Sequence, residues 1–362
     1  MQRAQVVVVT GASAGIGRAI ARAFGDEGAR VALLARDEAR LNAALDEVRD
    51  AGGEGTAIVT DVADADQLER AAMRVESELG PIDVWVNNAM TTVFGPVQDI
   101  TPEEFRRVTD VTYHGTVYGT MSALKRMRER DRGVIIQVGS ALAYRSIPLQ
   151  AAYCGAKHAM KGFTEALRTE LIHDGSNVQV SMVHLAAFNT PQFSWSRSHL
   201  PQHPQPLPPI YQPELAARAV LWTSKHPRRE VYVGAGTVTA IVWNKFFPGL
   251  LDRSLAISGY EEQMTNHAVD PNAPGNLFGP VEGVYGARGI FNEKALDDSL
   301  QFRMATQFPV PAIPNAITAI VGGTREGFHT VRALVTKRRQ QRQQDIAQAK
   351  NEGAGQPTQR AA

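Results

Sequence analysis

The sequence predicts an α/β fold, with a doubly wound parallel sheet of seven strands, helices on both faces and an irregular C-terminal extension. Two observations predict this class. Through the first two-thirds of the 362 residues, short β-rich apolar runs alternate with longer helical patterns, as in parallel sheets covered on both faces. The first run is followed by a glycine-rich turn, which is typical of the sheet edge where ligands bind.

Each predicted strand is a short run dominated by apolar residues, several of them β-branched, and bounded by turn residues or by a helical pattern. The strands are expected at residues 6–10, 31–35, 56–60, 84–87, 134–139, 178–184 and 231–234. The stretches between them show helical patterns and are expected to form right-handed crossover helices. The helices are expected at residues 18–24, 39–49, 67–79, 102–127 and 153–173.

Residues 191–213 form a proline-rich segment that leaves the sixth strand. Proline stiffens such a loop without adding a strand to the sheet. Because ligands bind outside the carboxyl ends of the strands, the segment is expected to wall a substrate pocket, with a solvated linker as the alternative. Whether Trp195 and His199 contact substrate stays open.

Three later segments differ in composition from the main domain. Residues 241–251 contain Trp243, Phe246 and Phe247, for which burial in the core is expected ahead of docking to a second subunit or contact with a membrane surface. The Pro-, Gly- and Asn-rich stretch after residue 260 is expected to wrap on the main domain or to be partly mobile. The predicted organisation is a main domain at 1–260, the irregular extension at 261–336 and a polar, disordered tail at 337–362.

Composition favours small-molecule partners over nucleic acid, because the formal net charge is only +1. A single cysteine, Cys154, excludes an internal disulfide framework and suits a reducing compartment. Residues 1–5 lead directly into the first strand and leave no room for a signal peptide, so a cytoplasmic location is expected. No uninterrupted apolar run reaches the length of about 18 residues that a membrane span requires.

The turn at residues 10–17 reads TGASAGIG and suits a pyrophosphate. Gly11, Gly15 and Gly17 allow the backbone to approach the phosphates, and the following helix offers free N–H groups and a favourable dipole. Their spacing differs from the G-x-G-x-x-G dinucleotide fingerprint, and an ordinary tight turn is the alternative. Ser13 adds a hydroxyl to the same turn, and Ile16 is expected to contact the cofactor.

Residues that follow the second, third and fourth strands are expected to bind the rest of a dinucleotide. Arg36 follows the second strand and can meet a 2′-phosphate, which favours NADP(H) over NAD(H). The neighbouring Asp37 leaves the choice between NADP(H) and NAD(H) open, because its carboxylate can pair with Arg36 or accept a hydrogen bond from a ribose hydroxyl. The candidates beyond the next two strands are Asp61, Val62, Asn88 and Ala89.

Tyr153 and Lys157 are the candidates for proton transfer. They stand four residues apart, so on a helix they share one face, where the ammonium can favour ionisation of the phenol. Ser140 ends the apolar run of the fifth strand. Together these residues and the glycine turn indicate a nicotinamide-dependent oxidoreductase.

Over residues 5–255 the chain resembles the short-chain dehydrogenase/reductase (SDR) family. The resemblance is carried by Thr10-Gly11 with Gly15 and Gly17, Asp61, Asn87-Asn88-Ala89, Ser140, and Tyr153 with Lys157. It implies a Rossmann-type sheet and hydride transfer to or from a nicotinamide. It further implies that Ser140 holds the substrate oxygen, that Tyr153 donates the proton in reduction, and that Lys157 binds the nicotinamide ribose and lowers the pKa of the phenol.

Three positions depart from the family pattern. Thr112 stands where the family usually has an asparagine that supports a water-linked proton path, and it is expected to alter this path rather than remove it. Leu185-Ala186 replaces the usual Pro-Gly ahead of Thr190, which is expected to contact the cofactor. Met90 replaces a glycine after the fourth strand. The set of Ser140, Tyr153 and Lys157 is intact.

The function expected from this resemblance is hydride transfer between NADP(H) and a carbonyl or secondary alcohol of an apolar substrate. The alternative is a catalytically weak nucleotide-binding regulator or scaffold that keeps the fold. Family members commonly assemble as dimers or tetramers, so a homo-dimer or homo-tetramer is expected.

The remaining candidate residues do not indicate a further catalytic or metal site. The histidines show no ligand spacing, so no metal site is expected. Glu103 and Glu104 suit the acidic first turn of a helix. Cys154 is expected to be a packed thiol. Contact of the later apolar segment with a membrane surface stays a lesser alternative.

Overall fold

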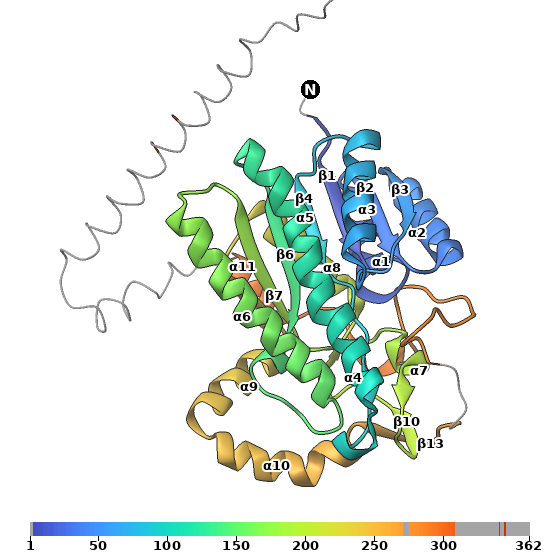
Figure 1. Cartoon of the computed structure of the whole chain (residues 1–362). Coiled ribbons are helices and arrows are strands. Elements are labelled where there is room, and N and C mark those ends of the chain that lie inside the picture. The colour runs from blue at the N-terminus through green and yellow to red at the C-terminus, as the bar shows by residue number, and fades with distance from the viewer. Residues whose placement is uncertain (1–2, 271–274, 308–339, 341–343, 345–362) are drawn as a thin grey trace, which may run out of the picture.

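The computed structural model describes residues 3–270, 275–307, 340 and 344. Its core is one sheet of seven parallel strands in the order β12-β7-β6-β4-β1-β2-β3 (Figure 1). The strands are β1 (Val6–Thr10), β2 (Arg30–Ala35), β3 (Glu54–Val59), β4 (Val84–Asn87), β6 (Val134–Ser140), β7 (Gln179–Leu185) and β12 (Glu230–Val233). The predicted class is confirmed, and each strand lies within two residues of its predicted position.

The alternation of side chains along β1 shows how the two faces are covered. Val7 and Val9 pack in a core cluster with residues of α1, α2 and α8, whereas Val6 and Val8 pack with residues of α3, α5 and α6. The helices are α1 (Gly15–Asp26), α2 (Glu38–Asp50), α3 (Ala65–Glu78), α5 (Gly115–Arg130), α6 (Ala151–His173) and α8 (Pro213–Lys225). The order of the strands reverses between β1 and β4, which places a ligand-binding crevice at their carboxyl ends.

The prediction of a single helix over residues 102–127 is wrong. The structure divides this stretch into α4 (Pro102–Thr109), a π-helical turn (Asp110–His114) and α5. Thr101 caps α4 with a capping box. Its hydroxyl accepts from the backbone amide of Glu104, and the Glu104 carboxylate accepts from the backbone amide of Thr101. A π turn inside a helix is a local irregularity that periodicity does not reveal, and it often lies near functional sites.

The proline-rich segment folds into short elements beside the sheet. They are α7 (Gln192–Trp195), β9 (Arg197–Ser198), β10 (Gln202–Pro204) and β11 (Ile210–Tyr211), and β8 (Ala187–Phe188) precedes them in the main domain. β9 pairs with β5 (Val93–Phe94), and β10 pairs with β13 (Met264–Ala268). β11 lies between β8 and β14 (Ala295–Leu296), so the segment is tied to the main domain on one side and to the extension on the other.

The prediction that the aromatic residues at 241–251 are buried in the core is wrong. They lie on α9 (Ala235–Phe246) and at the start of α10 (Pro248–Glu261), two helices that project below the sheet in Figure 1. Trp243 is 47% exposed, Phe246 67% and Phe247 52%. Pro248 opens a second helix, so the run of aromatics spans a helix boundary and cannot form one buried stripe. Among the described helices, none is both long and apolar enough to cross a bilayer.

Residues 275–307 of the extension lie against the main domain. They contain a 3₁₀ turn (Asn292–Lys294), β14 and α11 (Leu300–Gln307). Leu277, Phe291 and Phe302 are buried and each joins a different core cluster. The predicted tail at 337–362 lies outside the described residues, apart from 340 and 344.

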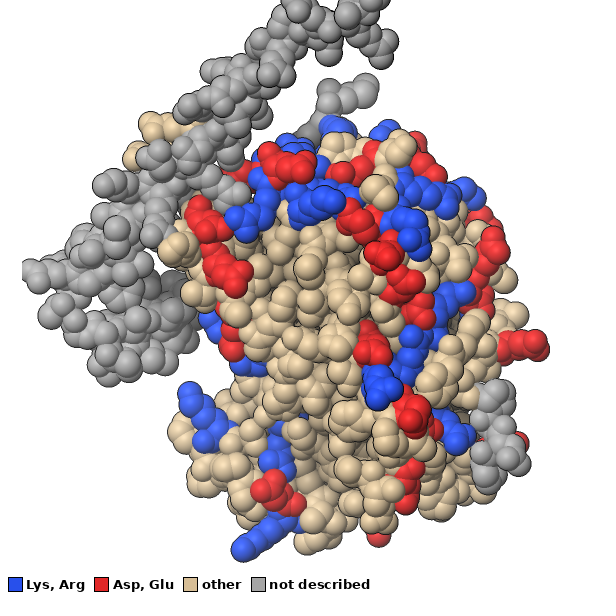
Figure 2. Space-filling model, in the orientation of Figure 1, with Lys and Arg blue, Asp and Glu red and all other residues tan. Residues whose placement is uncertain are grey.

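Charged side chains of both signs are interspersed over the surface, as the net charge near zero implies (Figure 2). They gather around the edge of the face that α5 and α6 cover, while the middle of this face carries few charges (Figure 2).

Candidate active site and nucleotide groove

Two adjoining cavities lie along the carboxyl edge of the sheet. The first, called the groove, encloses about 180 Å³ and runs past the ends of β1, β2 and β3. The second, called the pocket, encloses about 340 Å³ and lies against β6, β7 and α6. Both cavities are lined by Ile16, Asn88, Met90, Thr190 and Gln192. A molecule that occupies the groove can therefore present one end to the pocket.

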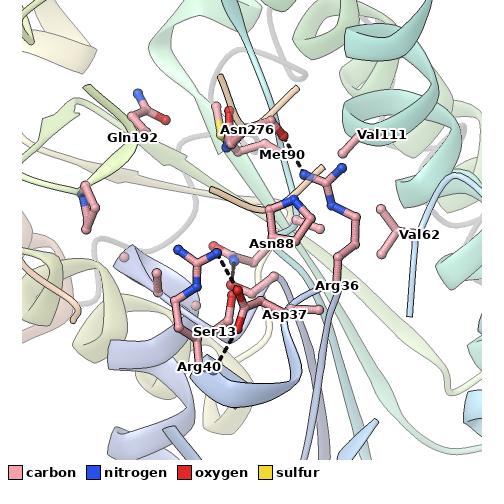
Figure 3. Close-up of a pocket in the computed structure, with 18 of the residues that line it drawn as sticks. Ser13, Arg36, Asp37, Arg40, Val62, Asn88, Met90, Val111, Gln192 and Asn276 are labelled. Carbon is pink, nitrogen blue, oxygen red and sulfur yellow. Dashed lines mark hydrogen bonds and ion pairs between the residues drawn. The ribbon is translucent and has the colours of Figure 1, made fainter. Parts of the chain in front are cut away.

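The glycine turn forms the floor of the groove (Figure 3). A Cβ at Gly17 would lie 2.2 Å from the carbonyl oxygen of Gly11, and Gly11 itself has a φ of +66°. Side chains are therefore excluded at both positions, and the backbone is exposed to the cavity. Asn88 fixes the position of the turn, because its side-chain amide donates to the carbonyl oxygens of Thr10 at 2.9 Å and Gly11 at 3.3 Å.

The far end of the groove carries charged residues. Arg36 donates to two backbone carbonyls of the extension, Asn276 at 2.5 Å and Leu277 at 3.3 Å. Asp37 caps α2, and its carboxylate accepts from the backbone and the guanidinium of Arg40, at 2.8 and 2.7 Å. Of the two alternatives left open for Asp37, pairing with Arg36 is not found, since Arg40, one helical turn on, is its partner.

Asp61 and Val62, after β3, also line the groove, as do Ser13, Gly15 and Ala89. Asp61 accepts from the guanidinium of Arg107 at 2.5 Å. Burial, followed by the charge of Arg107, lowers the pKa of Arg36 from its ordinary value. The structure thus brings most of the predicted nucleotide-binding residues together around one cavity, whereas Tyr153 and Lys157 line the pocket.

Ser140, Tyr153 and Lys157 line the pocket together. Ser140 ends β6, and its hydroxyl oxygen accepts from the backbone of Leu142 at 3.1 Å, while the hydroxyl also hydrogen bonds the Tyr153 phenol. Tyr153 lies in the first turn of α6. The Lys157 ammonium donates to the carbonyl of Val138 at 2.7 Å and lies 5.5 Å from the centre of the Tyr153 ring.

The lowering of the phenol pKa by Lys157, which the resemblance implies, stays a prediction, because burial is the largest influence on this group. Burial raises the pKa of Tyr153 above its ordinary value, and the hydrogen bond to Ser140 offsets only part of the rise. Burial also lowers the pKa of Lys157 to about 7. Lys157 is only 2% exposed, and this burial disfavours the charged form of its ammonium.

Thr112 does not line either cavity. Its side chain is fully buried in the π turn and bonds the backbone of Thr91, donating to the carbonyl at 3.0 Å and accepting from the amide at 3.2 Å. These two bonds tie the π turn to the loop that follows β4. The structure therefore gives Thr112 a role in holding this loop, and its hydroxyl proton is not free for a water path.

The walls of the pocket are mainly apolar. The proline-rich segment contributes Phe193, Pro206, Leu207, Pro208 and Pro209, which confirms that it walls a pocket. Sequence reasoning missed the contributions of α9 and α10, which supply Gly236, Thr237, Ala240, Leu251, Ser254 and Leu255.

Of the two open candidates in the proline-rich segment, neither lines the pocket. Trp195 lines the groove. His199 lies 2.8 Å from the carboxylate of Glu104, which also accepts from Arg197 at 3.0 Å. Glu104 is 5% exposed, so it serves as more than the acidic first turn of a helix and joins α4 to β9.

A polar network that sequence reasoning missed lies behind Ser140. Glu230 accepts from the phenols of Tyr144 and Tyr232, both at 2.6 Å. His184 stacks on Tyr232, and its Nδ1 lies 3.2 Å from the carbonyl of Ser140. Because a carbonyl only accepts, Nδ1 carries a proton, and Nε2 faces the Glu230 carboxylate at 3.7 Å. Glu230 and Tyr232 stand two apart on one strand face, which is the sequence signal for this pair.

Cys154 is buried, as expected. Among residues 3–270 and 275–307, no group of three or more His, Cys, Asp or Glu side chains is placed to hold a metal ion.

Comparison with known proteins adds to this geometry. A family model described as short chain dehydrogenase matches residues 5–200. The uncharacterized oxidoreductase YxnA of Bacillus subtilis (strain 168) is 36% identical over 310 residues, which cover 84% of this chain and 86% of YxnA.

Two solved structures are also similar. The alcohol dehydrogenase of Thermococcus sibiricus, complexed with 5-hydroxy-NADP, aligns with a TM-score of 0.56 and 27% identity over 64% of this chain and 95% of its own. A metagenomic short-chain oxidoreductase in complex with NADP aligns with a TM-score of 0.54 and 30% identity over 64% of this chain and 97% of its own.

Proposed function

Because the chain belongs to the short-chain dehydrogenase/reductase family, we propose that this NAD(P)-dependent oxidoreductase prefers NADP(H) and acts on a carbonyl or secondary alcohol of an apolar substrate. One observation carries the proposal. Ser140, Tyr153 and Lys157 line a single pocket, and this pocket adjoins the groove through five shared residues.

The groove fits a nicotinamide dinucleotide. Backbone without side chains at Gly11 and Gly17 suits a pyrophosphate at the start of α1, and the polar residues after β2 and β3 suit an adenosine ribose. Thr190, which lines both cavities, and Lys157, which lines the pocket, are proposed to hold the nicotinamide half. When bound there, the nicotinamide supplies or accepts the hydride.

Tyr153 is proposed as the general acid in reduction and as the base in oxidation. A phenol whose pKa is raised by burial keeps its proton until an oxyanion develops beside it, which suits the acid role. The Ser140 hydroxyl orients the same oxygen and stabilises its developing charge. Lys157, with its pKa near 7, gains its proton most readily when negative charge arrives in the pocket.

Arg36 supports the preference for NADP(H). A guanidinium has five N–H donors, and the two hydrogen bonds to extension carbonyls leave others for a 2′-phosphate. Both solved relatives are complexes with NADP or a derivative of it, which favours the same cofactor for this chain.

The walls of the pocket support an apolar substrate. Phe193, Leu207, Leu251 and Leu255 line it, and its volume of about 340 Å³ suits a molecule of drug-like size. We propose a ketone or aldehyde with substantial apolar surface, and the corresponding alcohol for the reverse reaction.

Assembly as a homo-dimer or homo-tetramer is proposed through the face of α5 and α6, whose middle carries few charges in Figure 2. Met121 on α5 is 60% exposed and Ile172 on α6 is 53% exposed, so apolar side chains are available to a second copy.

The test measures NADPH and NADH binding, and then cofactor oxidation against a panel of apolar ketones and aldehydes. We expect tighter NADPH binding and turnover of at least one panel member. Tyr153→Phe should keep nucleotide binding while turnover falls by about 10²–10⁴-fold, the usual contribution of general acid catalysis. A wild-type chain that binds NADPH but turns over no panel member would instead favour the regulator.

A further inference from the structure

The described part of the C-terminal extension passes over the groove. Asn276 and Pro280 line the cavity directly, opposite the glycine turn. Figure 3 shows Asn276 across the cavity from Ser13 and Asp37, joined to Arg36 by a hydrogen bond. The residues that make these contacts lie beyond residue 200, where the match to the family model ends.

The first anchor of this segment lies at the adenosine end of the groove. The carbonyl of Leu277 accepts from Arg36 and, at 3.1 Å, from Arg107, while its side chain is 1% exposed in the cluster that Tyr153 packs against. The backbone amide of Asn276 donates to the carbonyl of Trp195 at 2.9 Å. The segment therefore contacts both the sheet edge and α7 at this end.

The second anchor lies over the glycine turn. The amide of Gly15 donates to the carbonyl of Gly286 at 3.1 Å, and Arg18 donates to the carbonyl of Tyr285 at 3.0 Å. The Tyr285 ring meets the Trp195 ring edge to face, with centres 4.4 Å apart. The guanidinium of Arg40 lies 5.1 Å from the Trp195 ring and 5.6 Å from the Tyr285 ring, which favours this arrangement by cation–π attraction.

The third anchor lies at the end of the groove next to the pocket. The amide of Gly289 donates to the carbonyl of Asn189 at 3.1 Å, and the amide of Phe291 donates to the side chain of the same residue at 2.9 Å. A Cβ at Gly289 would lie 2.5 Å from the carbonyl oxygen of Thr190, so the two backbones are in direct contact.

We infer that residues 275–277 and 285–291, called the groove wall, form part of the dinucleotide-binding site and retain the bound nucleotide. The inference rests on the proposed function and extends it to residues outside the matched family segment. The three anchors span the groove from the end of β2 to the end of β7 and β8. Asn276 lines the cavity opposite the glycine turn, and the bonds of residues 285–291 hold this segment in place, so the wall restricts the exit of a bound nucleotide.

The wall should therefore set the rates of nucleotide exchange. Because the wall restricts release, loosening an anchor should raise the dissociation rate of NADPH, and it should not lower the association rate. A purely structural role of the segment would change stability and leave both rates as they are.

Gly289→Ala is the sharpest variant, because the added methyl group would press the wall away from Thr190. Tyr285→Ala is the second variant and removes the ring that meets Trp195 and Arg40. Gly279→Ala is the matched control, since a Cβ at Gly279 would meet no atom within 4 Å and Gly279 lies outside the two wall stretches.

The experiment follows NADPH release from the full chain by stopped-flow fluorescence after displacement with excess NADP⁺. We expect release to be faster by about tenfold in Gly289→Ala and Tyr285→Ala and unchanged in Gly279→Ala. Unchanged release in both folded wall variants overturns the inference and leaves the proposed function intact. If the wild-type chain binds neither NADPH nor NADH, the inference and the proposed function both fail.

Discussion

At the scale of single residues, desolvation decides the state of the proton-transfer groups. Tyr153 and Lys157 share one face of α6, as their spacing predicts, but Lys157 is buried and Tyr153 is partly buried. Burial favours the neutral form of each group, so it raises the pKa of the phenol and lowers that of the ammonium. This is consistent with the proposal that Tyr153 keeps its proton until charge develops in the substrate.

Lys157 should make the stability of the protein depend on pH. Its pKa falls from 10.5 in the unfolded chain to about 7 in the folded protein. Between these values the unfolded chain binds the extra proton, so the contribution of Lys157 to the free energy of unfolding rises with pH.

We expect the free energy of unfolding of the wild type to rise relative to that of Lys157→Met by roughly 2 kcal/mol between pH 7 and pH 9. Urea denaturation of both proteins at the two pH values measures this difference. Parallel changes in the two proteins would show that the lysine keeps an ordinary pKa when folded.

Arg36 should discriminate between the two cofactors. Its guanidinium lines the groove at the adenosine end, and hydrogen bonds between charged groups contribute about 1.5–3 kcal/mol. Arg36→Gln should therefore weaken NADPH binding by about tenfold or more and change NADH binding little.

Fluorescence titration with both cofactors measures the ratio of the two dissociation constants. The control is Arg22→Gln, which removes an exposed arginine of α1. Equal weakening of NADPH and NADH binding in Arg36→Gln would mean that the residue supports the groove wall without contacting a 2′-phosphate.

At the scale of elements, the contact between α5 and the sheet depends on a close approach. Asn87 joins three elements, because its side chain accepts from Trp85 at 2.8 Å and donates to Thr120 and Gln137. A Cβ at Gly119 would lie 2.4 Å from the Asn87 side-chain oxygen. The glycine allows α5 to cross β4 at the distance that this buried network requires.

Gly119→Ala should lower the free energy of unfolding by about 1–3 kcal/mol, because overpacking displaces the network around Asn87. The matched control is Gly162→Ala on α6, where a Cβ meets no atom within 4 Å, and this change should stabilise the helix by roughly 0.5–1 kcal/mol. Urea denaturation of both variants measures the difference. Similar effects of the two substitutions would contradict the packing argument.

At the scale of the whole molecule, the extension and the seven-stranded sheet share a core. Phe302 of α11 is 7% exposed and belongs to the same cluster as Val7, Val9 and Val231. Residues nearly 300 positions apart in the sequence are thus packed together. We propose that the described extension unfolds with the main domain in one transition.

Phe302→Ala should lower the free energy of unfolding by about 3–5 kcal/mol in that single transition. Leu300→Ala is the control on the same helix, because Leu300 is 69% exposed and should change stability by less than about 0.5 kcal/mol. Calorimetry shows whether the wild type has one transition and whether the variant shifts it. A separate transition that moves alone in Phe302→Ala would assign the extension to an independent unit.

The sequence by itself determined the class of the sheet, the positions of its strands, and the meeting of the glycine turn with Ser140, Tyr153 and Lys157. These features depend on periodicity and on the rule that parallel strands end at one edge, and both are local properties. The same local signals did not reveal the π turn before α5, because a single added residue leaves the helical pattern nearly unchanged.

Only the tertiary structure decided how the site is enclosed. Backbone carbonyls are the hydrogen-bond partners of Arg36, Gly15 and Thr112. Because every residue carries a backbone carbonyl, no side chain in the sequence identifies these partners. The groove wall closes over the glycine turn across more than 250 residues, and the aromatics of α9 and α10 stay exposed because those helices lie outside the main core. Such contacts depend on the arrangement of complete elements, which periodicity within one segment does not specify.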